Sequence, residues 1–127
     1  MPYEFHIDHE KRLIHKKVWG LYNDVEAIES TLRFSQIDVH EEYDELHDLI
    51  GVTSYEVSSK TISERARDSV AAEKSEFDGK KVAIVVPSKL VHGMTRMYMG
   101  YHEGSKEEIR IFSELQLAQQ WLAGSAT

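Results

Sequence analysis

The sequence predicts an α/β domain: a mixed, mostly parallel, five-stranded sheet with four helices, in the order β-β-α-β-α-β-α-β-α. The most apolar run, residues 82–86, is hydrophobic on both faces, which is typical of a central parallel strand covered on both sides. Segments with helical spacing alternate with the later strands, which favours crossover connections within one sheet. Two alternating segments near the start are close enough to pair as a hairpin.

The hairpin strands are predicted at residues 3–8 and 13–22, joined by a polar turn at residues 9–12. Tyr3, Phe5 and Ile7 alternate with polar residues, which is the period of a half-buried strand. The second strand has Gly20 near its end and leads directly into a helix.

That helix is predicted over about residues 23–35. The side chain of Asn23 can accept a hydrogen bond from a free N–H group at the helix start, and Glu26 follows three residues later, as in a capping box. The apolar residues of the segment recur at spacings of three and four: Val25, Ile28 and Leu32.

The segment at residues 40–50 fits two interpretations. Tyr43, Leu46 and Ile50 lie at helical spacing, and the segment is rich in acidic residues, which are poor strand formers. The order of the other elements favours a strand instead, from about Asp44 to Leu49. We expect the strand, although the sequence alone leaves residues 43–49 undecided.

Serine, proline and glycine mark the boundaries of the remaining elements. We expect a helix ending at residues 78–79, a strand at 81–86, a helix ending near 104, a strand at 108–112 and a last helix ending at 124. Each of these helices follows a serine that can cap it: Ser58 or Ser59, Ser88 and Ser113.

Composition narrows the class of protein. The apolar content of 41% is ordinary for a folded protein, and 127 residues suit one domain, with its core at about residues 3–122. The lack of cysteine excludes disulfides and cysteine-based sites. The net charge of −7 argues against nucleic-acid binding. We expect a cytoplasmic protein, because neither a signal peptide nor a transmembrane run of ~18 apolar residues is recognisable.

No catalytic motif is recognisable either. P-loop, nucleophile-elbow and dinucleotide-binding patterns are absent, so we expect neither an enzyme nor a bound cofactor. His40 and His47 flank an acidic stretch, but their spacing does not fit the HExxH zinc motif. We therefore expect no metal site and interpret the acidic residues of 41–48 as a solvated face.

Three segments carry a family resemblance: Ile14–Gly20, Phe77–Val85, and Glu108–Phe112 followed by Ala118–Leu122. Their order and spacing are similar to those of the SpoIIAA-like proteins, in the wider group of STAS and Sec14-type domains, over about residues 3–122. The resemblance implies a mixed sheet with helices packed mainly along it.

The best-known members of that group are bacterial anti-sigma-factor antagonists. They bind a partner kinase and are switched by serine phosphorylation at an Asp-Ser-Ser-Gly motif that opens a helix. The matching stretch here is residues 56–59, in which the acid, the first serine and the glycine are all changed. The resemblance thus implies Ser58 as a phosphorylation candidate, where a phosphate would meet free N–H groups; the alternative is a plain N-cap.

The helix after residue 88 holds the second candidate site. Methionine and tyrosine form adaptable apolar surfaces, and the candidates to face a ligand or membrane are Leu90, Val91, Met94, Met97, Tyr98, Met99 and Tyr101. The alternative is that this stripe packs into the core.

Two functions follow from these features. The first is a non-catalytic binding or regulatory module, peripheral at the membrane if its ligand is a lipid, because other relatives in the group bind lipids or membranes. The second is a phosphoregulated antagonist of the STAS type. The partner classes are an apolar small molecule, a lipid surface, another protein and a second copy of the chain.

Overall fold

The computed structural model describes residues 2–64, 80–87, 92–93, 95–96 and 107–124. Its strands are β1 (Tyr3–Asp8), β2 (Leu13–Asn23), β3 (Asp44–Glu56), β4 (Lys81–Val85) and β5 (Glu108–Phe112), and its complete helices are α1 (Asp24–Ser35) and α4 (Leu115–Leu122). A further helix begins at Ser59 and is described to Glu64, and residues 92–93 and 95–96 are helical. The predicted α/β class and five-stranded sheet are confirmed, whereas the count of four helices is not confirmed within these residues.

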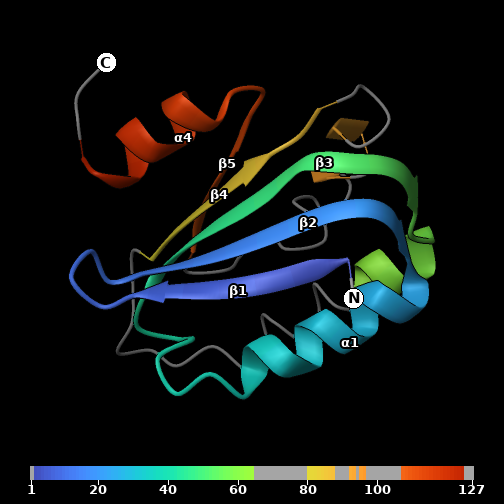
Figure 1. Cartoon of the computed structure of the whole chain (residues 1–127), viewed down its shortest axis with the longest axis horizontal. Helices are drawn as coiled ribbons and strands as arrows, with labels where there is room; N and C mark the ends of the chain where they lie inside the picture. Colours follow the sequence, from blue (N-terminus) through green and yellow to red (C-terminus); the bar gives the residue numbers. More distant parts are fainter. Residues whose placement is uncertain (1, 65–79, 88–91, 94, 97–106, 125–127) are drawn as a thin grey trace.

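The strands lie in the sheet in chain order, from β1 to β5 (Figure 1). β1 pairs antiparallel with β2, and the other three pairs are parallel. This is the mixed, mostly parallel sheet that the sequence predicts. Connections that always move in one direction with the same hand place their helices on one face of the sheet. Ala27 of α1 and Ile62 of the helix that begins at Ser59 belong to one buried cluster, so both helices lie on the same side of the sheet.

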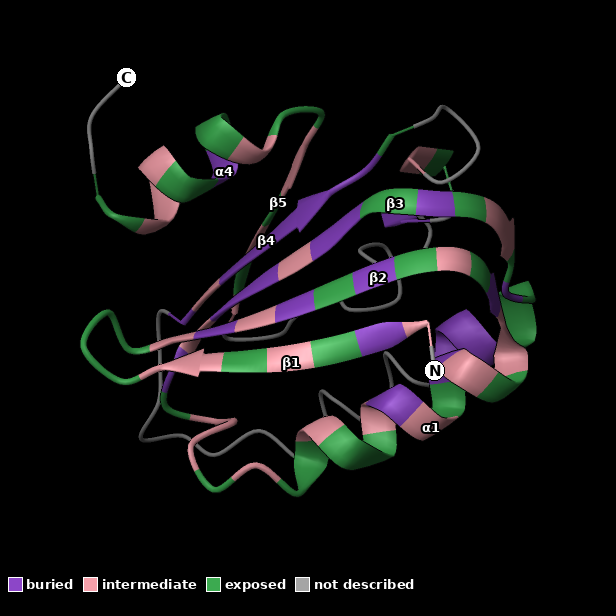
Figure 2. Cartoon of the chain, viewed as in Figure 1, coloured by how far each residue is buried: buried purple, intermediate pink, exposed green. Residues whose placement is uncertain are grey.

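The two faces of β4 support two separate clusters. Val82 and Ile84 belong to the cluster that includes Ala27 of α1, whereas Ala83 and Val85 belong to the cluster that includes Ala118 of α4. Figure 2 shows β4 buried along most of its length, as the apolar sequence of this strand predicted. α1 and α4 consequently pack against opposite faces of the sheet.

β3 is a strand, but it is longer than predicted. It runs from Asp44 to Glu56 and pairs with β2 from Leu13 opposite Asp44 to Asn23 opposite Glu56. Gly51 lies beside Trp19, and a Cβ atom at this position would come within 2.9 Å of the Trp19 Cβ. Pairing along the whole of β2 therefore outweighs the helical spacing and the acidic composition of the segment.

The helix starts follow the predicted caps with one correction. The Asn23 side chain accepts a hydrogen bond from the backbone N–H of Glu26, as predicted. α4 begins at Leu115 with Glu114 in the cap position and no side-chain cap hydrogen bond, so the prediction that Ser113 caps this helix is wrong. Packing of the α4 apolar residues on the sheet stabilises this helix without a cap.

Candidate functional site

The apolar candidates Leu90, Val91, Met94, Met97, Tyr98, Met99 and Tyr101 all lie outside the described residues. Among the described neighbours, Thr95 is buried, and the exposed Arg96 donates a hydrogen bond from Nε to His92 Nε2 at 2.8 Å.

Ser58 is exposed and caps the helix that begins at Ser59. Its Oγ accepts a hydrogen bond from the Thr61 backbone N–H at 3.2 Å, and its carbonyl accepts one from the Ile62 N–H. Ser58 thus has the geometry of an N-cap and also the accessibility that a kinase substrate needs.

Asp24 joins this cap to the start of α1. Its Oδ1 accepts a hydrogen bond from the Ser58 backbone N–H at 2.7 Å. This hydrogen bond lowers the pKa of Asp24. The first turns of two helices therefore meet where parallel strands β2 and β3 end.

α1 exposes the apolar residues that identify it in the sequence. We call Val25, Ile28 and Leu32 the outer row; they are 68%, 55% and 60% exposed. The buried residues of the helix are Ala27 and Ser30. Their small side chains let α1 approach the sheet closely, and the larger apolar residues point to solvent.

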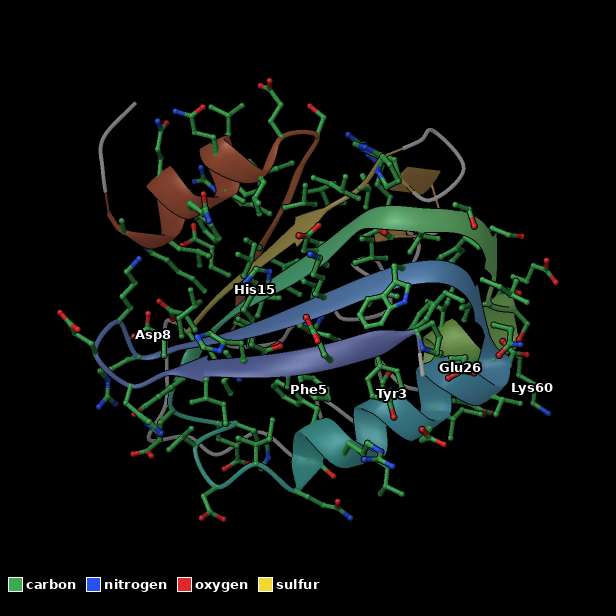
Figure 3. All side chains as sticks on the ribbon, in the orientation of Figure 1. Tyr3, Phe5, Asp8, His15, Glu26 and Lys60 are labelled. Atoms are coloured by element: carbon green, nitrogen blue, oxygen red, sulfur yellow. The ribbon has the colours of Figure 1, made fainter. Side chains whose placement is uncertain are left out.

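A row of charged residues follows the outer row at the same spacing. We call Glu26, Glu29 and Arg33 the charged row. Glu29 accepts a hydrogen bond from the Tyr3 hydroxyl at 2.5 Å and lies 3.7 Å from Arg33 Nε. Figure 3 shows Tyr3 pointing from β1 towards α1, with Glu26 on that helix. Burial and the hydrogen bond to Glu29 raise the pKa of Tyr3 to about 12.

The inner side of α1 covers a buried polar network. Lys16 Nζ donates to Ser30 Oγ at 2.7 Å and to the Tyr22 hydroxyl at 3.0 Å, and these two hydroxyls are 2.9 Å apart. Lys16 and Ser30 are both buried, so the hydrogen bonds offset part of the cost of removing the ammonium group from water. The network gives the middle of α1 a polar anchor.

A second network lies at the C-terminal end of α1. Glu45 is buried; its Oε2 is 2.5 Å from Lys80 Nζ and its Oε1 accepts a hydrogen bond from His47 Nε2 at 2.7 Å. Lys80 also donates to the His40 carbonyl. The Phe34 ring of α1 lies near Lys80, with the ammonium 5.5 Å from its centroid.

The charges of this network depend on one another. Burial alone would raise the pKa of Glu45, but Lys80 and His47 lower it to about 2. Burial alone would lower the pKa of Lys80, but Glu45 and Glu107 raise it. Glu45 and Lys80 are therefore both ionised throughout the neutral range. They form an internal ion pair whose charged groups also have hydrogen-bond partners.

Another histidine–carboxylate pair lies on the opposite face. His15 Nε2 is 3.7 Å from Asp48 Oδ2, and burial lowers the pKa of His15 despite that carboxylate. Asp48 also accepts a hydrogen bond from the Ile50 N–H at 3.1 Å. The expectation of a solvated acidic face at residues 41–48 is thus wrong for Glu45 and Asp48, because each is buried with a cationic or histidine partner.

The polar groups do not converge on one centre. His47 and His15 belong to networks on opposite faces of the sheet, and the sequence pattern of acids and histidines gave no sign of this separation. No group of three or more histidine and carboxylate side chains is arranged to hold a metal within the part of the chain that the structure describes. In the same residues, no helix has the length and apolarity needed to cross a membrane.

The sequence did contain the signal for the outer row. The spacing of Val25, Ile28 and Leu32 indicates a helix with one apolar side, but spacing does not tell which side faces the sheet. The small residues Ala27 and Ser30 on the other side were the available clue, because a close helix–sheet contact favours small side chains.

Comparisons with protein-family models, with curated proteins and with solved structures find no match to this chain. The resemblance to the SpoIIAA-like proteins therefore stays a prediction, and the candidate site rests on its own geometry.

Proposed function

We propose that this chain is a non-catalytic binding module that recognises a protein through the outer row of α1. The observation that carries the proposal is the exposure of Val25, Ile28 and Leu32 side by side on a helix that is anchored to the sheet by other residues. Neighbouring exposed apolar side chains of this kind mark interaction surfaces. The expected SpoIIAA-like relationship supports the same kind of role.

The charges around the outer row favour a protein over a membrane. α1 has acidic residues Asp24 and Glu26 in its first turn and Glu29 in its middle, and the whole chain has a net charge of −7. Anionic lipid surfaces attract basic segments and repel acidic ones. A protein can place a cation opposite each acid, which a lipid surface does not do at fixed positions.

Site-specific photo-crosslinking in cells tests the proposal. A photoreactive residue is placed at Leu32 of the outer row, and a matched one at the exposed Gln119 of α4. We expect a crosslinked protein adduct from position 32 only, and its loss when Ile28→Asp is added. Equal adducts from both positions, or none from position 32, would contradict the proposal.

A second measurement, vesicle flotation, tests whether the partner is a lipid surface instead of a protein. Flotation with vesicles of neutral phosphatidylcholine, and with vesicles that also contain anionic phosphatidylglycerol, is expected to leave the chain unbound. Flotation that persists in Ile28→Asp would point to the segment at residues 90–101 as the ligand site. Flotation that Ile28→Asp abolishes would replace the protein partner with a lipid surface.

A regulated Ser58 is the second candidate function, favoured by its exposure and by its contact with Asp24. A phosphate on Ser58 would gain the N–H groups of one helix but would face the Asp24 carboxylate at the start of the other. Phosphorylation would therefore weaken the hydrogen bond that joins α1 to this helix and would change the presentation of the outer row.

Phosphorylation mapping with kinase-containing extract of the native cell tests this second function. We expect phosphate on wild type and on Ser59→Ala, and none on Ser58→Ala, since Ser58 and Ser59 are both exposed neighbours. Phosphate at Ser59 instead, or at neither serine, would reject Ser58 as the regulated residue.

A further inference from the structure

We infer that β1 pairs edge to edge with β1 of a second copy of this chain, so that two five-stranded sheets join into one. The inference goes beyond the proposed function, because it uses a different surface from the outer row. β1 is the outermost strand at one side of the described sheet, with β2 as its neighbour (Figure 1). Its other side is an open edge, to which a further strand can add.

Alternate residues of β1 direct their backbone groups to this edge. The Trp19 N–H donates to the Pro2 carbonyl at 2.9 Å, and the antiparallel register continues without a shift to Asp8 opposite Leu13. In such a pair, residues that bond to the partner strand alternate with residues whose N–H and carbonyl groups point away from it. The outward residues of β1 are therefore Tyr3, Phe5 and Ile7. Within the described residues, none of their backbone groups has a hydrogen-bond partner.

β1 lacks the features that usually keep an edge strand from pairing. Residues 3–8 contain neither proline nor lysine, and no bulge twists the strand away from the sheet. The edge is thus regular along its whole length.

α1 covers the face of the sheet and leaves this edge open. Ser30 bonds to Lys16 of β2, and the Phe34 ring lies 6.1 Å from the Phe5 ring of β1 and 6.3 Å from the His47 ring of β3, measured between centroids. α1 therefore lies beneath β2, between the two strands that flank it. A strand added beside β1 does not run into this helix.

One register uses every outward group of both strands. A two-fold axis perpendicular to the sheet keeps the α1 faces of the two copies on the same side and makes the two β1 strands antiparallel. Hydrogen-bonded pairs can then form only between outward residues. Phe5 opposite Phe5, with Tyr3 opposite Ile7 on either side, bonds all of them.

The side chains are complementary in the same register. On the α1 face, Tyr3, Phe5 and Ile7 meet only one another, so the apolar surface continues across the contact. On the other face, the exposed Glu4 of each copy lies opposite the exposed His6 of its partner. Side chains approach most closely at such non-hydrogen-bonded positions, so the imidazole can donate to the carboxylate.

The edge strand at the other side of the sheet is not complementary to itself. The Glu108 N–H donates to the Lys80 carbonyl, so the outward residues of β5 are Ile109 and Ile111. The two-fold register that uses both of them places Arg110 directly opposite Arg110, which is unfavourable. The charges therefore favour β1 as the strand that meets a second copy.

Sedimentation velocity of the full chain, from about 1 μM to about 1 mM, tests the inference. Wild type is expected to shift from monomer to dimer across this range. Ile7→Pro should stay monomeric, because it removes an outward N–H and obstructs the added strand but spares the hydrogen bonds to β2. Ile109→Pro makes the same change on β5 and should dimerise like wild type. Thermal unfolding by circular dichroism checks that each variant is folded.

Charge reversal tests the register with variants that keep the backbone intact. His6→Glu places two carboxylates opposite each other at both Glu4 positions and should weaken dimerisation about tenfold. The double variant Glu4→Lys/His6→Glu should recover it, because a cation again faces each carboxylate.

Monomeric wild type at every concentration would overturn the inference. A folded Ile7→Pro that dimerises like wild type, or a double variant that dimerises no better than His6→Glu, would overturn the pairing of β1 with β1. The crosslinks expected at position 32 are measured separately, so the proposed function of the outer row can fail or stand without this inference.

Discussion

α1 and α4 are both amphipathic helices, yet they pack on the sheet in opposite ways. α4 turns its apolar side inward, where Leu115, Trp121 and Leu122 surround the buried Ala118. α1 turns its apolar side outward and buries Ala27 and Ser30. The residues beneath each helix account for the difference. Ala118 of α4 packs with the apolar Leu46, Ala83 and Val85. The α1 face also has an apolar cluster, which includes Val82 and Ile84, but Ser30 of α1 meets the polar groups of Lys16 and Tyr22.

The groups opposite α1 thus decide which of its sides is buried. Lys16 and Tyr22 accept the side that supplies a hydroxyl, as Ser30 does, and this leaves the apolar side free for a partner.

Breaking the buried ion pair should cost the most. Lys80→Met leaves Glu45 buried without its main cationic partner, so we expect the free energy of unfolding to fall by about 3–5 kcal/mol. Urea unfolding at neutral pH measures the change, and Lys60→Met at an exposed position is the control. A loss below ~1 kcal/mol would mean that this pair does not support the α1 face.

Truncating a leucine beneath α4 and a leucine of the outer row should lower the free energy of unfolding by very different amounts. Leu46→Ala beneath α4 removes a fully buried side chain and should cost about 2–5 kcal/mol. Leu32→Ala in the outer row removes a largely exposed one and should change stability by less than about 0.5 kcal/mol in the monomer. Equal losses in urea unfolding would show that Leu32 is buried and that the orientation of α1 is wrong.

Removing the hydroxyl beneath α1 should have an intermediate effect. Ser30→Ala deletes one acceptor of Lys16 and one partner of Tyr22, so we expect a loss of about 1–3 kcal/mol. Ser35→Ala, at an exposed position at the end of the same helix, serves as the matched control and should change little. Indistinguishable unfolding midpoints for the two variants would show that the polar network does not anchor α1.

The pH dependence should show a smaller effect. The pKa of Glu45 is lowered from 4.5 to about 2, so its contribution to stability is complete above the unfolded value and is lost as the pH falls towards 2. By pH 4 the loss from this group should be about 1 kcal/mol. Chemical unfolding at pH 7 and pH 4 checks this, and the double variant Glu45→Gln/Lys80→Met should lose correspondingly less on acidification.

The sequence predicted the elements whose signals are local. Alternation located β1, the apolar run located β4, and the Asn23 cap located the start of α1. It did not predict the extension of β3 to Glu56, because pairing with β2 is a long-range interaction that residues 50–56 do not encode locally.

The candidate site was predicted less well than the fold. Ser58 was found because capping is a local property, and the structure has Ser58 as an exposed cap. The outer row was recognised as a helical pattern but not as a surface, since its direction depends on Lys16 and Tyr22, which belong to a different element. The buried state of Glu45 likewise depends on Lys80, thirty-five residues away in the chain.

Thiol labelling of single-cysteine variants tests the orientation of α1 most directly, because the sequence contains no cysteine. Ile28→Cys should react with a disulfide reagent about as fast as an unfolded peptide, because Ile28 is largely exposed. Ser30→Cys should be protected whenever the chain is folded, because Ser30 is buried. Protection of Ile28→Cys to the same degree as Ser30→Cys would contradict an outward-facing outer row.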